Sequence, residues 1–182
     1  MRRVLALAVV GAACATILAA PADAFVDRAA PVRHTAQAGA SALETAVLGD
    51  VNRVRAQHGL GPLRVSARLA AAASQHSREM ARRGYFSHDS ADGSAFWKRL
   101  ERFYGSAHYR FWSVGENLLW SSPDVDAPGA VDMWMKSPPH RANLLNARWR
   151  EIGISALHVT AAPGDYHGLD VTIVTADFGV RR

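Results

Sequence analysis

The segment that most constrains the fold is the apolar run from Asp170 to Val180, near the end of the chain. Successive side chains of an extended strand point to opposite faces of a sheet. Both faces are apolar in this run, with Val171 and Ile173 on one and Val174, Ala176 and Phe178 on the other. Such a strand needs a covering layer on each side. The run therefore predicts the central strand of a sheet that is buried on both faces.

The chain before this run combines helical periodicity with two more candidate strands. Apolar residues recur at helical spacing in segments 43–58, 67–83, 94–104 and 128–136, and Ser137 with Pro138 predicts the start of a short fifth helix. The segments Glu151 to Val159 and Val114 to Trp120 are β-rich. Helices first and strands last predict an α+β domain, built as a helix–sheet–helix sandwich.

The N-terminus has the three regions of a secretory signal peptide. Two arginines follow Met1, an apolar run extends from Val4 to Ala20, and the small-residue pattern at 21–24 predicts cleavage after Ala24. The alternative is an N-terminal membrane anchor. We favour cleavage because the apolar run is at the short limit for a span of about 20 residues. The expected organisation is a signal peptide over 1–24, a flexible leader over 25–42 and one domain over 43–182.

The single cysteine, Cys14, lies inside the predicted signal peptide. Lipidation there would need a larger aliphatic residue three positions earlier, where Gly11 stands. The processed chain would then have neither disulfides nor thiolate chemistry, so its stability would depend on the apolar core. The predicted location is secreted or periplasmic, and we expect a monomer.

Composition and charge limit the classes of possible partner but do not identify a single one. Hydrophobic residues make up 49% of the chain and charged residues 20%, which excludes wholesale disorder and a collagen-like repeat. The formal net charge is +5 and the sequence pI is about 10.0, which favours anionic partners. The basic residues are dispersed and are not interleaved with aromatic residues as in nucleic-acid-binding modules, so nucleic acid is an unlikely partner.

Five short segments, in order along the chain, resemble the CAP superfamily, also called the SCP-like family. They are Val51–Arg55 with Gly59–Leu63; Tyr85–His88; Gly115–Leu118; Trp134–Arg141; and Ile152–Ile154 with Asp177–Gly179. The resemblance covers residues 43–182 and is strongest to the disulfide-free, single-domain bacterial form. It implies a three-layer α-β-α sandwich with a small, mostly antiparallel sheet. It also implies a cleft lined by two histidines and, in many members, two glutamates.

Carried over by motif, His88, Glu116 and His140 match three of those four cleft positions. The second glutamate would fall near Ser137, so the set is incomplete in this chain. Asn117 and Asp89, next to the matched residues, are candidate cleft or supporting residues. From the residues alone, a hydrogen bond to a neighbouring loop is favoured for each histidine, and it is the family resemblance that favours a place in the cleft. Glu116 is either an acceptor that orients a histidine or a loop anchor that accepts backbone N–H bonds.

These three residues are also the candidate catalytic set. His140 falls in the first turn of the short helix, where the helix dipole should lower the pKa of its imidazole. Two histidines and water make only a weak Zn²⁺ site, because stable catalytic zinc sites generally have three protein ligands. We therefore expect His88 and His140 to bind Zn²⁺ or another divalent cation at low affinity, with no other cofactor.

The expected function is binding of an extracellular lipid, a cell-envelope polymer or a small ligand in the histidine-lined cleft. The alternative is a hydrolase of cell-envelope peptide, ester or glycan bonds, with the histidines and Glu116 activating water. A two-acid glycosidase would need a second carboxylate, such as Asp89 or Asp92. Whether the chain is an enzyme stays open at this stage.

Overall fold

The computed structural model describes the backbone of residues 37–182 and the side chains of residues 42–182. The elements are α1 Gln37–Gln57, β1 Arg64–Val65, α2 Ala67–Arg83, α3 Phe96–Phe103, β2 Trp112–Ser121, α4 Ala127–Lys136, α5 Pro138–Leu144, β3 Glu151–Ala162, the 3-10 turn η1 Gly164–Tyr166 and β4 Leu169–Arg181. The α+β prediction is confirmed. The predicted signal peptide, with Cys14, and most of the predicted leader lie outside the described residues. No helix of the described part is long and apolar enough to cross a membrane.

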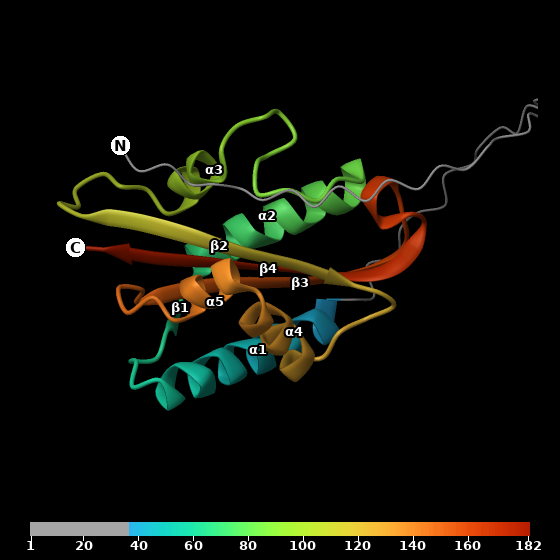
Figure 1. The fold of residues 1–182 in the computed structure, drawn as a ribbon. Helices are drawn as coiled ribbons and strands as arrows, with labels where there is room; N and C mark the ends of the chain where they lie inside the picture. The colour runs from blue at the N-terminus through green and yellow to red at the C-terminus, as the bar shows by residue number, and fades with distance from the viewer. Residues whose placement is uncertain (1–36) are drawn as a thin grey trace, which may run out of the picture. The chain divides into compact units, whose positions relative to one another are not determined.

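The four strands form one sheet in the order β1-β3-β4-β2. β4 pairs antiparallel with both β3 and β2, and the two-residue β1 pairs parallel with β3. The strand predicted to be central, β4, is flanked on both sides. β2 is therefore an edge strand along its whole length (Figure 1).

Helices cover both faces of the sheet and form the three layers expected from the sequence. α2 and α3 lie on one face, and α1, α4 and α5 lie on the other (Figure 1). The main core joins the second group to the sheet, with Trp134, Ile152 and Phe178 at most 1% exposed. On the opposite face, Met80, Ile173 and Tyr166 are fully buried. β4 contributes to both cores, as its two apolar faces predict.

Local sequence signals fix the ends of several helices. Ser66 caps α2 by accepting a hydrogen bond from the Leu69 N–H, and Gly84 ends it with φ of 67°, a backbone conformation that favours glycine. The predicted start of α3 at Ser94 is wrong, because the helix begins at Phe96 and the Ser94 hydroxyl bonds Asp92 instead. α1 begins at Gln37, inside the segment predicted as leader.

A glycine sets how closely α2 approaches the sheet. A Cβ atom added at Gly153 of β3 would lie 2.0 Å from the backbone nitrogen of Ala70 and 2.1 Å from the carbonyl carbon of Leu69. Any larger residue would therefore push α2 away from β3. This close contact positions α2, and the loop that follows it, beside the middle of the sheet.

Candidate functional site

The candidate site is built around two consecutive residues of the edge strand β2, Glu116 and Asn117. Consecutive side chains of a strand point to opposite faces. Glu116 lies on the face covered by α2 and α3, where it meets His88. Asn117 lies on the other face and donates a hydrogen bond of 3.0 Å to the backbone carbonyl of His140. One strand thus holds both predicted histidine segments at the same edge of the sheet.

Glu116 is a buried carboxylate that is fully engaged by two side chains. Its Oε1 accepts a hydrogen bond of 2.8 Å from Nδ1 of His88, and its Oε2 forms an ion pair with the guanidinium of Arg99. The side chains of Glu116 and Arg99 are both 0% exposed, whereas that of His88 is 49% exposed. The alternative in which Glu116 anchors a loop through backbone N–H bonds is therefore wrong, because its partners are side chains.

Arg99 also fixes the backbone that carries His88. Its Nη1 donates to the His88 carbonyl at 3.2 Å and to the Ser90 hydroxyl at 3.1 Å. Burial opposes the charged form of Glu116, but the hydrogen bond from His88 and the charge of Arg99 outweigh it and lower the pKa of Glu116. Glu116 therefore stays ionised and orients the His88 ring, leaving Nε2 free to act.

A second buried carboxyl group, Asp177, lies directly across from Glu116. The two residues are register partners on β2 and β4, and both side chains face α2. Asp177 is fully buried, and neither of its oxygens has a hydrogen-bond donor among the described residues. Burial, followed by the facing Glu116 charge, raises the pKa of Asp177 well above its ordinary value. Two ionised carboxylates cannot hydrogen-bond each other, whereas a protonated carboxyl group at Asp177 is neutral and has an O–H to offer to the facing Glu116.

His140 is held mainly through its backbone and through the asparagine network below it. Asn117 accepts a hydrogen bond of 3.0 Å from Asn143, which in turn accepts one from the Trp149 indole. Burial, followed by the nearby charge of His88, lowers the pKa of the His140 imidazole. The direction of this shift agrees with the sequence expectation, and burial and the charge of His88 are causes that the sequence did not indicate. A neutral imidazole at neutral pH is a proton acceptor and a possible ligand.

His76 supports the site from beneath without reaching it. This histidine of α2 is fully buried, and its Nε2 donates to the Ser87 carbonyl at 2.8 Å, one residue before His88. Burial lowers its pKa, so the ring is neutral. The sequence places His76 in an apolar stripe, and the structure agrees that it is a core residue that supports the loop.

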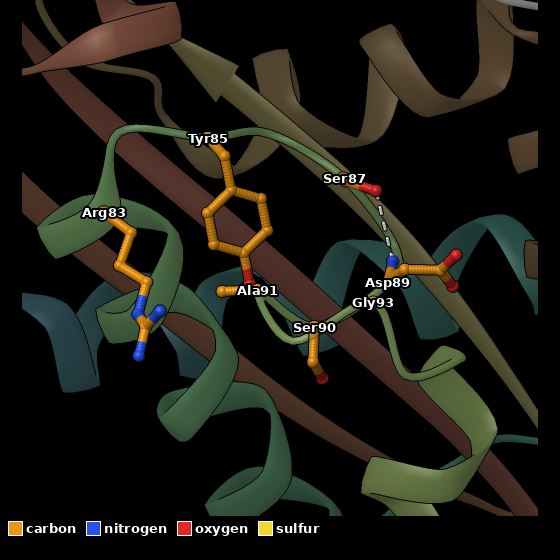
Figure 2. Close-up of a pocket in the computed structure, with 7 residues that line it drawn as sticks. All are labelled: Arg83, Tyr85, Ser87, Asp89, Ser90, Ala91 and Gly93. Atoms are coloured by element: carbon orange, nitrogen blue, oxygen red, sulfur yellow. Dashed lines mark hydrogen bonds between the residues drawn. The ribbon is translucent and has the colours of Figure 1, made fainter.

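A pocket of about 500 Å³ lies beside this loop but is not lined by His88, Glu116 or His140. Figure 2 shows Arg83, Tyr85, Ser87, Asp89, Ser90, Ala91 and Gly93 around it. The Asp89 carboxylate points away from Tyr85, and the Asp89 N–H bonds the Ser87 hydroxyl (Figure 2). Of the predicted supporting residues, Asp89 thus belongs to the pocket rather than to the histidine pair.

Comparison with known proteins places this fold and these motifs in one family. The family model of CAP, the cysteine-rich secretory protein family, matches residues 48–178. The chain belongs to the CAP family. A solved extracellular protein of Bacillus anthracis that contains an SCP domain superposes with a TM-score of 0.62 and 26% identity, covering 85% of this chain and 45% of that one. An outer surface protein of Borrelia burgdorferi matches with a TM-score of 0.58 and 18% identity, covering 76% and 92%.

A sequence relative extends beyond the CAP domain. The uncharacterized membrane protein YlbC of Bacillus subtilis is 35% identical over 111 residues, which are 61% of this chain and 30% of YlbC. The chain therefore spans less than a third of that relative and less than half of the Bacillus anthracis protein. The functions of the remaining parts of those proteins are therefore not carried over to this CAP domain.

The metal donors that the CAP resemblance implies are incomplete in this chain. Among residues 42–182, no three His, Cys, Asp or Glu side chains are placed to hold one metal ion. Ser137 stands where a second carboxylate is expected, at the junction of α4 and α5, and its side chain makes no capping hydrogen bond. A stable zinc site with three protein ligands therefore does not fit these residues.

Two residues of this CAP site, Arg99 and Asp177, are absent from the candidates chosen by sequence. Each breaks an apolar pattern: Arg99 lies on the inner face of α3 with Phe96 and Leu100, and Asp177 interrupts the apolar run of β4. A charged residue at a core position needs a buried partner. That rule, applied to both positions, would have indicated a buried ionic network beside the histidines.

Proposed function

We propose that this CAP protein binds an extracellular ligand at the edge of β2, through the imidazoles of His88 and His140. The observation that supports this most directly is the His88–Glu116 pair. A buried, ionised carboxylate holds Nδ1 of a half-exposed histidine, which fixes the orientation of the ring and leaves Nε2 without a hydrogen bond to the described residues. An oriented hydrogen-bonding group at a surface is typical of a recognition site.

The charge state of Glu116 favours binding over hydrolysis. A general base must accept a proton in the reaction, and its pKa is best close to the working pH. Glu116 has a lowered pKa, and both its oxygens are occupied by His88 and Arg99. Proton transfer to it would break the buried ion pair with Arg99. Glu116 is therefore suited to orienting His88 rather than to exchanging protons with a substrate.

The proposed ligands are an extracellular lipid, a cell-envelope polymer or a small molecule with polar groups that meet the two imidazoles. The location proposed is outside the cytoplasm, on the basis of the N-terminal signal pattern. The similarity to a Bacillus anthracis protein described as extracellular supports the same location. We also propose that the two imidazoles bind a divalent cation weakly, as a pair of ligands rather than as a complete zinc site.

The imidazole signals of the folded protein test the binding proposal. We expect soluble peptidoglycan fragments, or dispersed lipid, to shift the NMR signals of His88 and His140 together while the exposed His158 serves as the internal control. If neither the His88 nor the His140 signal shifts with any of these ligands, the result contradicts the proposed binding site. Calorimetric titration of Zn²⁺ gives a second test: we expect weak binding that is lost in His88→Ala and kept in His158→Ala. Equal binding by wild type and His88→Ala would refute the cation part.

A second candidate function, hydrolysis, rests on the same oriented imidazole. A histidine whose Nδ1–H is held by a carboxylate can accept a proton from water at Nε2. His140, with its lowered pKa, is the other available proton acceptor. The test is turnover of peptidoglycan, casein and ester substrates by wild type and His140→Ala. Activity that disappears in the variant would replace the binding proposal by an enzymatic one.

A further inference from the structure

One end of the sheet collects arginines from all four strands. It is the end where β2 and β3 begin and β4 finishes, as the pairing of Trp112 with Arg181 and of Glu151 with Gly179 establishes. Across the sheet, an arginine stands at the end of each strand: Arg64 in β1, Arg150 before β3, Arg181 in β4 and Arg110 before β2. Arg148 lies two residues before Arg150. We call these five residues the arginine row.

Backbone contacts join the members of the arginine row across the strands. The Arg64 N–H bonds the Arg150 carbonyl at 3.0 Å, and the Arg150 N–H bonds the Gly179 carbonyl at 3.1 Å. On the other side, the Phe111 N–H bonds the Arg182 carbonyl at 3.1 Å, which joins the Arg110 segment to the end of β4. Neighbouring strands are about 4.8 Å apart, so the row spans roughly 15 Å.

The charge of the arginine row is not neutralised within the described residues. None of its five members forms an ion pair with a carboxylate there. Arg64, Arg110, Arg148 and Arg150 are exposed. Glu151, next to Arg150 in the sequence, accepts a hydrogen bond from the Tyr104 hydroxyl and forms no ion pair with the row.

Two arginines of the row are held in place, which lowers the entropy lost when they bind a partner. The guanidinium of Arg181 lies 3.8 Å from the ring centre of Tyr104 and 4.8 Å from that of Tyr109. Nη1 of Arg150 donates to the carbonyls of residues 147–149. Their remaining N–H groups form fixed forks, and the guanidinium fork matches the geometry of a phosphate.

The loops at the opposite end of the sheet carry negatively charged residues. The turns that follow β2 and β3 carry Asp124, Asp126 and Asp165, and Asp170 lies at the start of β4. Arginines 78, 82 and 83 of α2 lie toward that end, and Arg83 is near Glu79, at 3.9 Å. Five arginines without a carboxylate partner among the described residues therefore lie at one end of the sheet, an arrangement that attracts an extended anion.

We propose that the arginine row binds a linear polymer with repeating phosphate groups. An arginine at each strand end can meet successive phosphates along one direction. An anionic membrane surface is the competing partner, because Val65, Tyr109 and Phe111, at 66%, 43% and 41% exposed, lie beside the row, and vesicles are therefore one arm of the test. A nucleic acid fits less well because Arg181 covers the face of Tyr109 on which a base would stack. This surface is separate from the histidine site, since Glu116 lies in the interior of β2.

The test uses inorganic polyphosphate as the probe, with the full folded protein. We compare wild type with the triple variant Arg64→Gln, Arg110→Gln, Arg148→Gln, because the guanidinium groups of these three form no hydrogen bond or ion pair with the described residues. The matched control is Arg78→Gln, Arg82→Gln, Arg83→Gln, which removes the same charge from α2. Unfolding midpoints establish that both variants are folded.

We expect wild type to bind polyphosphate with an affinity that falls as salt rises, because binding releases counterions. The row variant should lose roughly tenfold or more in affinity and show a shallower salt dependence, and the control should stay close to wild type. Equal losses in both variants would overturn the proposal, since only net charge would then matter. Tighter binding of anionic lipid vesicles or single-stranded DNA than of polyphosphate would overturn the assigned partner.

Discussion

Replacing Asp177 by asparagine tests how the buried charges of the histidine site are balanced. The facing carboxyl groups of Asp177 and Glu116 share one buried space, and Arg99 supplies one positive charge. The arrangement is balanced when Glu116 is ionised and Asp177 holds a proton. An asparagine has the same shape as the protonated aspartic acid and can still donate to Glu116. The substitution should therefore leave the fold intact.

The pH dependence of the effect follows from the direction of the pKa shift. The pKa of Asp177 is raised above its ordinary value of 3.8. Above that pH the unfolded chain releases the proton and the folded protein keeps it, so folding takes up a proton. Stability contributed by this group is complete below pH 3.8 and is lost as pH rises through the folded-state pKa. An asparagine side chain has no proton that titrates in this range, so the Asp177→Asn variant should not lose this stability as the pH rises.

The expected magnitude is about 1.4 kcal/mol for each pH unit between the unfolded and folded pKa values. Urea unfolding at a series of pH values from 4 upward measures it, as the difference in unfolding free energy between Asp177→Asn and wild type. This difference should grow in favour of the variant as the pH rises above 3.8 and should level off once the folded-state pKa is passed. Asp170→Asn, on the same strand but exposed, corrects for the general loss of one carboxylate. A difference that does not change with pH would refute the protonated state of Asp177.

Three further substitutions probe the site and its supports, each by urea unfolding. Glu116→Gln leaves the guanidinium of Arg99 buried without its counter-charge and should cost about 3 kcal/mol or more; a loss below about 1 kcal/mol would mean that the ion pair is unimportant. Gly153→Ala forces a Cβ into the backbone of Ala70 and should cost about 2 kcal/mol, whereas an unchanged midpoint would show that α2 is free to move away. Asp126→Ala removes the cap of α4, a hydrogen bond of 2.8 Å, at a cost of about 1 kcal/mol; no loss would show that water replaces the cap.

Much of the fold can be predicted from the sequence because its main signals are local or periodic. The two apolar faces of β4 require a covering layer on each side, and the cap at Ser66 and the stop at Gly84 set the ends of α2. β1 is missed because two residues carry no periodicity, and its pairing with β3 depends on tertiary contact. The start of α3 is misplaced because Ser94 has Asp92 as a closer hydrogen-bond partner than the helix N–H groups.

The site is predictable only in part, because its partners come from distant segments. Motif order identifies His88, Glu116 and His140, and β2 brings all three to one edge. The pairing of Glu116 with Arg99 and its opposition to Asp177 depend on strand register and on how α3 packs. Neither can be read from spacing along the chain. The cause of the lowered pKa of His140 was missed for the same reason, since the charge of His88 acts through space.

The measurement that tests the central claim most directly is the NMR pH titration of His140 in wild type and in His88→Gln. If the two imidazoles share one site, the positive charge of His88 helps to lower the pKa of His140. Removing that charge should raise the titration midpoint of His140, while the control variant His158→Gln should leave it unchanged. An identical His140 midpoint in wild type and His88→Gln would contradict a shared site.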